Sequence, residues 1–167
     1  PVRRMLEMGV PVGAGSDATR VASYNPWVAL YWLTTGRTVG GMALYGESNL
    51  LSRKEALHLY TQGSGWFSSE QDRKGTISAG QLADFAALSA DYFSAPDEAV
   101  KHIVSVLTVV GGKVVYGAEE FSKLSPPLPP ISNDWSPVLY YGGYHREERP
   151  ALATHRISAH SCMRHER

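Results

Sequence analysis

The sequence predicts an α+β fold in which helices come first and strands follow, and three observations lead to this class. Apolar residues recur at helical spacing between recognisable caps over much of residues 1–71. Beyond residue 72 the period of the apolar residues falls from 3.6 to 2, which is typical of strands. The β-branched run 103–110 then meets Gly111-Gly112 and residues 113–116, the pattern of a two-residue hairpin.

In the first part, residues 2–8 have helical spacing and end at Gly9. Residues 10–12 are then expected to form a buried strand, in an apolar run that breaks at Gly13 and Gly15. Asn25-Pro26 is a cap followed by a residue suited to the first helical turn, so a helix is expected up to Gly36. Residues 52–55 form a capping box that begins a helix reaching about residue 62. A further short helix is expected within residues 63–71.

In the second part, residues 75–77 are expected to start a strand, residues 78–80 to turn, and residues 83–88 to form a short buried strand. The proline-rich run 125–130 suits an extended surface path. Beyond it we expect four aromatic residues to dock and residues 145–167 to be loose; the four are Trp135, Tyr140, Tyr141 and Tyr144. The predicted boundaries are 1–71, 72–124 and 125–167.

Composition narrows the classes of function. Sixteen Lys and Arg balance sixteen Asp and Glu in 167 residues, and no basic stripe is interleaved with aromatics, which argues against a nucleic-acid partner. No apolar run reaches the roughly 18 residues that a membrane span needs, and the N-terminus lacks a signal-peptide layout, so a cytoplasmic setting without membrane contact is expected. Cys162 is the single cysteine and excludes an internal disulfide. Because Pro1 lies inside a predicted helix, we expect the chain to be a fragment.

Asp17 is the leading candidate for chemistry, because it follows the predicted strand 10–15 directly, and loops after barrel strands carry catalytic groups. Gly-Ser-Asp is also good turn chemistry, so a loop or cap role is the plainer alternative. Residues 13–18 also fit a dinucleotide-binding fingerprint, but the next helix starts late and no acidic residue occurs between Ala18 and Gly46.

The other candidates have structural interpretations. Asp84, at a strand entry, is expected to accept hydrogen bonds from nearby turn amides, and His58 and His102 lack neighbours at ligand spacing. Two groups remain: an aromatic one expected to serve in packing (Trp27, Tyr31, Trp32), and a C-terminal one able to bind metal only adventitiously (His155, His160, Cys162, His165).

Four segments together carry a resemblance to a known family: residues 15–18 (GSDA), 51–57 (LSRKEAL), 74–88 (KGTISAGQLADFAAL) and 108–116 (TVVGGKVVY). In this order the chain resembles the C-terminal part of a metal-dependent amidohydrolase, in the branch called amidohydrolase family 3. The similarity runs from about residue 1 to residue 144.

The resemblance implies a (β/α)₈ TIM barrel that binds one or two divalent metals, usually zinc, plus a small β-sandwich built from both ends of the parent chain. Residues 10–15 would be the last barrel strand, and residues 75–116 part of the sandwich. Asp17 matches the family's aspartate, a metal ligand that takes the proton from the metal-bound water. The family's His-x-His pair and its other ligands would lie before Pro1.

This comparison leads to two classes of function. The first is part of a hydrolase that acts on carbon–nitrogen bonds, other than peptide bonds, of a small amide, cyclic amide or deaminable substrate. Because activating water at a metal usually takes three or more protein ligands, the fragment alone is expected to be inactive. The second class is a noncatalytic association module, which would pair with another chain or a second copy through exposed barrel edges.

Overall fold

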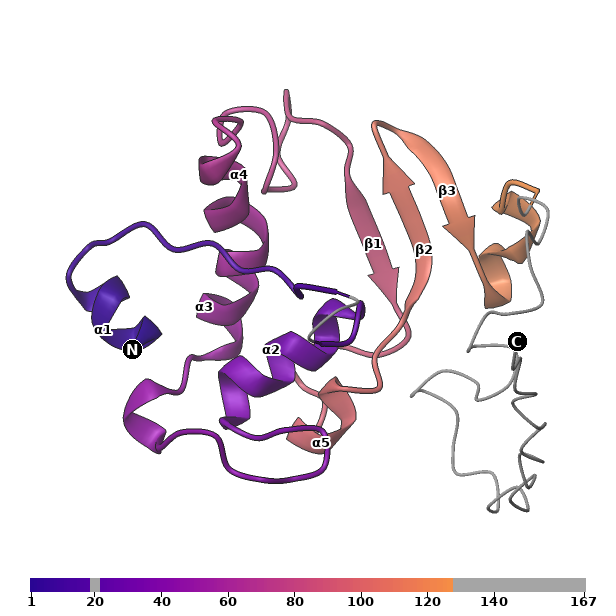
Figure 1. The fold of residues 1–167 in the computed structure, drawn as a ribbon. Helices are drawn as coiled ribbons and strands as arrows, with labels where there is room; N and C mark the ends of the chain where they lie inside the picture. The colour runs from indigo at the N-terminus through magenta and orange to yellow at the C-terminus, as the bar shows by residue number, and fades with distance from the viewer. Residues whose placement is uncertain (19–21, 128–167) are drawn as a thin grey trace, which may run out of the picture. The chain divides into compact units, whose positions relative to one another are not determined.

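The computed structural model describes residues 1–18 and 22–127 as a small mixed α/β structure with a three-stranded antiparallel sheet (Figure 1). The helices come first and the strands follow, as the sequence predicts. The helical elements before the sheet are α1 (Val2–Glu7), α2 (Pro26–Thr35), the 3₁₀ turn η1 (Glu47–Asn49), α3 (Arg53–His58), the π-helical turn η2 (Leu59–Gly63) and α4 (Ser64–Phe67). The remaining elements are β1 (Phe85–Leu88), α5 (Asp97–Val100), β2 (Ser105–Val110), β3 (Lys113–Gly117) and the 3₁₀ segment η3 (Glu119–Leu124).

The predicted helices are confirmed, with their caps. Asn25 accepts a hydrogen bond from the Trp27 N–H, and Pro26 is the first residue of α2. Ser52 and Glu55 form the expected capping box at the start of α3. The predicted helix 53–62 and the short helix after it are one column, α3–η2–α4, in which the π-helical turn joins the two α-helical ends (Figure 1).

The sheet has the order β1-β2-β3, and the predicted hairpin connects its last two strands. Val110 faces Lys113 across the turn, and Gly111 and Gly112 have φ angles of 56° and 76°. Positive φ at both central positions is what a hairpin of this type requires, and glycine adopts it without steric cost. The Asp84 carboxylate accepts the Gly111 N–H at 2.6 Å, which confirms that it serves a turn amide.

Two predicted strands are wrong and a third is altered. Residues 10–15 are extended without ladder bonds, because no strand lies beside them among the described residues. Residues 75–77 form no strand, since the Gln81 side chain accepts from both the Thr76 N–H and hydroxyl and folds the backbone into a loop. The strand at 83–88 is shortened to β1, and its first two residues are exposed rather than buried.

The hydrophobic core joins the helices to the segment that leads into β2. Helix α2 buries four consecutive residues, more than the single face that the sequence predicts, because α3 and α5 cover it from different sides. The core consists of Leu30, Tyr31, Leu51, Ala56, Leu59, Tyr92, Val100 and Ile103. Burying each of the larger side chains stabilises the fold by roughly 1.5–3 kcal/mol.

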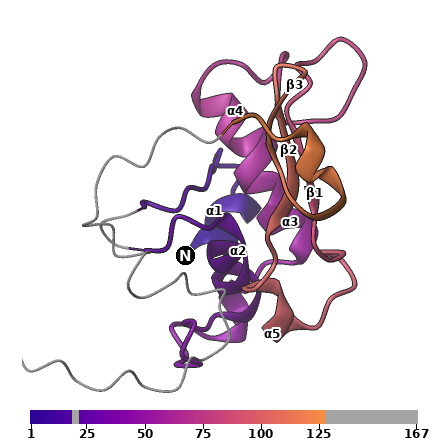
Figure 2. The ribbon, with the colours of Figure 1, turned by 90° about the vertical axis from the view of Figure 1, so that its right-hand side faces the viewer.

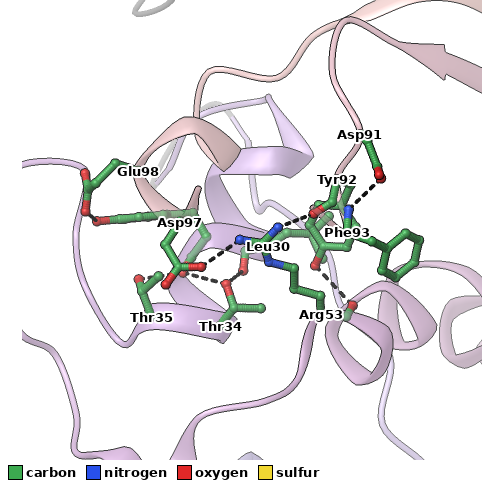
Figure 3. Close-up of polar contacts among 10 residues, drawn as sticks. Leu30, Thr34, Thr35, Arg53, Asp91, Tyr92, Phe93, Asp97 and Glu98 are labelled. Carbon is green, nitrogen blue, oxygen red and sulfur yellow. Dashed lines mark hydrogen bonds and ion pairs between the residues drawn. The ribbon is translucent and has the colours of Figure 1, made fainter. Parts of the chain in front are cut away.

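Polar contacts tie α5 and the loop before it to α2 and α3 (Figure 3). The Arg53 guanidinium donates to the Tyr92 carbonyl and to the Asp97 carboxylate, the latter at 2.7 Å. The buried Tyr31 hydroxyl donates to Glu98 at 2.8 Å. These bonds tie the connection between β1 and β2 to the helices. Figure 2 shows α5, which lies in that connection, below α2.

Helix α1 is held by one arginine. Arg3 binds the Glu55 carboxylate with both terminal nitrogens, at 2.7 and 3.1 Å, and also donates to the Leu50 carbonyl. Hydrogen bonds from Arg3 first, and then from Ser52, lower the pKa of Glu55 from 4.5 to about 2. The same carboxylate therefore completes the α3 cap and anchors α1. Within residues 1–18 and 22–127, no helix has the length and apolarity to cross a bilayer.

We expect Asn25→Ala to destabilise the chain by about 1–3 kcal/mol. The substitution removes the α2 cap and leaves the Ile103 carbonyl without its hydrogen-bond donor. The Asn25 side chain is buried, 7% exposed, and its amide donates to Ile103 at 3.3 Å. Asn25→Ser keeps a cap acceptor without the amide donor and should lie between wild type and alanine. Urea denaturation measures the effect. Equal stability of the serine variant and wild type would contradict a contribution from the bond to Ile103, and equal stability of the serine and alanine variants would contradict the cap.

We expect acid to weaken the Glu55 anchor. Because the folded-state pKa of Glu55 is lowered from 4.5 to about 2, its contribution is fully present above about pH 4.5 and is lost as the pH falls towards 2. The difference in free energy of unfolding between wild type and Glu55→Gln should therefore shrink between pH 5 and pH 2.5. Urea titrations at several pH values test this, and a constant difference would show that the carboxylate is not stabilised in the folded state.

Candidate functional site

Asp17 lies exposed at the end of the extended segment 10–15, in a left-handed backbone conformation with φ of 50°. Aspartate is among the few residues that adopt this conformation readily. Beside it, the Ser16 hydroxyl accepts the Ala18 N–H at 3.3 Å, and Ala18 forms an isolated bridge with Ala22. Among the described residues, the turn bond at this point is thus made by Ser16.

The segment before Asp17 is held by the α3–η2–α4 column. The Ala14 N–H donates to the Leu59 carbonyl at 3.0 Å. The Ser64 hydroxyl lies 2.9 Å from the Ala14 carbonyl oxygen and 3.0 Å from that of Leu59. A π-helical turn inserts one extra residue into the helix and so loosens its regular ladder. Here that turn presents Leu59 and Ser64 to the segment where a barrel strand was predicted.

The close approach of the two backbones depends on Gly63. A Cβ at Gly63 would overlap the Val12 carbonyl oxygen, whereas its backbone angles are ordinary helical ones. A Cβ at Gly13 would also meet the Phe67 ring, at 2.9 Å. Small residues at these two positions allow residues 12–14 to lie directly on the helix column. This contact sets the position of Asp17, three residues beyond Ala14.

A metal site does not form from the described residues alone. Among residues 1–18 and 22–127, no group of three or more His, Cys, Asp or Glu side chains comes together. A carboxylate oxygen is a suitable donor for zinc or another divalent ion, but stable binding takes several such donors around one point. Asp17 therefore supplies one donor and the described chain does not fit a metal by itself.

The other sequence candidates lie elsewhere. His58 is exposed on α3 and His102 is exposed just before β2, and Asp84 serves the hairpin turn. Tyr31 is fully buried and the Trp27 ring lies 5.5 Å from that of Tyr92, so these aromatics pack as predicted. The C-terminal group of histidines with Cys162, and the four aromatic residues expected to dock, lie outside the described residues.

Two larger open cavities occur in the described part beside a smaller one of about 250 Å³, and Asp17 lines none of the three. One, of about 690 Å³, lies between the α3–η2–α4 column and β1 and includes Tyr60, Lys74 and Phe85. The other, of about 530 Å³, includes Arg37, Glu47 and Asp97. Three further residues of the candidate site escaped the sequence analysis: Leu59, Gly63 and Ser64. The only signal for them was a run of small residues, Gly63 to Gly65, inside a capped helix.

Comparison with known proteins identifies the class. The profile of the amidohydrolase family matches residues 1–116, so the chain belongs to the amidohydrolase family, as the resemblance implied. It is 41% identical to the amidohydrolase homologue YtcJ of Bacillus subtilis (strain 168) over 117 residues, covering 68% of this chain and 22% of that protein. It is 28% identical to an N-substituted formamide deformylase of Arthrobacter pascens over 116 residues, covering 70% of this chain and 21% of that protein.

The chain thus spans about a fifth of the length of the curated relatives that it matches. No solved structure is significantly similar to it. The family assignment therefore rests on sequence, while the geometry around Asp17 comes from the structure.

We expect Gly63→Ala to destabilise the chain by about 1–3 kcal/mol, the cost of forced overpacking, although alanine favours helices by about 1 kcal/mol. The matched control is Gly65→Ala in the same column, where the nearest atom, the Lys74 carbonyl oxygen, is at ordinary contact distance, 3.4 Å. Gly65→Ala should be neutral or stabilising. Thermal and urea unfolding measure both, and equal effects of the two variants would contradict the contact with Val12.

Proposed function

We propose that this chain is part of a metal-dependent hydrolase that acts on carbon–nitrogen bonds other than peptide bonds. The observation that carries the proposal is the family match over residues 1–116, which includes Asp17 at the end of its extended segment. The substrate class is a small amide, cyclic amide or deaminable compound. The name of the Arthrobacter pascens relative adds N-substituted formamides to the compounds worth assaying.

In this function Asp17 is the family's aspartate, and its carboxylate joins ligands that lie outside the described residues. We propose that residues 10–15 become a strand of a (β/α)₈ barrel once neighbouring strands pair with them, and that β1, β2 and β3 belong to a β-sandwich. The extended backbone before Ala14 is suited to such pairing, while Ala14 keeps its own bonds to the helix column. Zinc as the metal and a cytoplasmic setting remain part of the proposal, as do the boundaries 1–71, 72–124 and 125–167.

The 167-residue chain alone should be inactive, for a physical reason. A carboxylate is in general a weak base towards free water, whose pKa is close to 16. A lone Asp17 therefore has no nucleophile that it can easily deprotonate. The rate acceleration depends on groups that the described residues do not bring together.

A second candidate function is a noncatalytic module that associates with another chain or a second copy. The observation in its favour is unpaired backbone. Residues 10–15 have no strand beside them in the described part, and Val10 is 38% exposed. Strands β1 and β3 are also the two edges of the described sheet. Unpaired extended segments invite pairing with other chains.

We expect Asp17→Asn in the full-length protein to lower kcat by at least about 100-fold, the usual scale for a group that transfers a proton. Bound divalent metal should fall as well, because one ligand oxygen is replaced by a neutral amide. Inductively coupled plasma mass spectrometry measures the metal. Across a substrate panel, formate released from N-substituted formamides, ammonia released from ureas, and the ring-opened product of cyclic amides, separated by chromatography, measure the activity.

Glu7→Gln is the matched control, because Glu7 is an exposed carboxylate at the end of α1. It should retain both metal and activity. Full activity in Asp17→Asn would contradict the proposed role of Asp17. Wild-type protein that binds no metal and hydrolyses nothing in the panel, but forms a stable dimer, would favour the association module.

A further inference from the structure

We propose that Ser64 is a positioning residue for Asp17. It would act by clamping Ala14 to the helix column and so fixing the start of the loop that carries the Asp17 carboxylate. This inference rests on the proposed function of Asp17. It adds a residue on a different element, 47 positions along the chain, whose hydroxyl controls where that carboxylate lies.

Two hydrogen bonds hold Ala14 on the helix column. Its N–H donates to the Leu59 carbonyl, and its carbonyl lies 2.9 Å from the Ser64 hydroxyl. The Leu59 carbonyl and the Ser64 hydroxyl of the helix column therefore hold both backbone polar groups of Ala14. In the described part of the chain these bonds replace the ladder that a strand would have supplied.

The Ser64 hydroxyl has a single proton to donate. The hydroxyl lies within hydrogen-bond distance of two carbonyl oxygens, those of Ala14 and Leu59, but can donate fully to only one. The Leu59 carbonyl already accepts the Ala14 N–H, whereas the Ala14 carbonyl has Ser64 as its recorded partner. The proton is therefore best used on Ala14. A serine that merely bonded back to its own helix would not contact this segment.

Ala14 and Asp17 lie close together along the chain. Only Gly15 and Ser16 lie between them, and the Ser16 hydroxyl accepts from Ala18, which restricts the turn on the far side. Asp17 thus lies between two fixed points. A shift of Ala14 therefore moves the Asp17 carboxylate. Small displacements of catalytic groups lower the rate of catalysis strongly.

The experiment compares Ser64→Ala, Ser64→Thr and Ser68→Ala in the full-length protein. Ser68 is the matched control, because its hydroxyl donates to Gly65 and not to the Asp17 segment. We expect Ser64→Ala to lower kcat about 10- to 100-fold, the scale for groups that orient a metal ligand. KM and the melting temperature should change little. Ser64→Thr keeps a hydroxyl and should restore most of kcat, and Ser68→Ala should match wild type. The substrate is the best-hydrolysed compound of the panel.

A second measurement needs no activity. Amide hydrogen exchange in the 167-residue chain should show faster exchange at Ala14 in Ser64→Ala than in wild type. Ala118, whose N–H donates to Val106 at 2.8 Å in the sheet part, is the internal reference and should be unchanged. Equal acceleration at Ala14 and Ala118 would mean general destabilisation and would overturn the positioning role.

The outcomes separate the inference from the function on which it rests. Full activity in Asp17→Asn, or a wild-type protein inactive on the whole panel, contradicts the proposed function, and the inference falls with it. A damaged Asp17→Asn beside an unaffected Ser64→Ala leaves the function intact and overturns the inference. A loss of kcat in Ser64→Ala that Ser64→Thr does not restore also overturns it.

Discussion

The buried side chain of Asn25 is the contact on which the described structure most depends. It caps α2 through the Trp27 N–H and donates its amide to the Ile103 carbonyl, immediately before β2. One residue thus begins the central helix and ties it to the segment that leads into the sheet. Asn25 is also the buried polar residue at the start of the first helix after Asp17. Such a bond is costly to lose because its partner is left unpaired.

On the other side of Asp17, the π-helical turn holds residues 12–14. Gly63 allows the backbones to touch, Leu59 supplies an acceptor and Ser64 a donor. A regular α-helix of the same length would direct these groups along its own ladder. The irregular turn therefore bonds the backbone of Ala14, as a neighbouring strand would in a sheet. Irregular helical turns are frequent at functional sites, and the proposed role of Asp17 gives this one a purpose.

The chain belongs to the amidohydrolase family. The described residues contribute one exposed carboxylate in a left-handed conformation and the elements that hold it. Their ion pairs serve structure: Arg3 with Glu55 and Arg53 with Asp97 attach outer elements to α3. The stabilising charges are thus separate from the carboxylate proposed for chemistry.

By itself, the sequence determined the local features of this protein: the Asn25 and Ser52 caps, the Gly111-Gly112 hairpin, and Asp84 as the acceptor for a turn amide. It also singled out Asp17 as the candidate functional residue. Each depends on residues a few positions apart, or on turn chemistry that residue type dictates. Tertiary structure decided that residues 10–15 form no ladder, that the α3 column contains a π-helical turn, and that Ser64 meets Ala14. These outcomes depend on which segments come together in space, and pairing between distant segments leaves no periodic pattern in a single sequence.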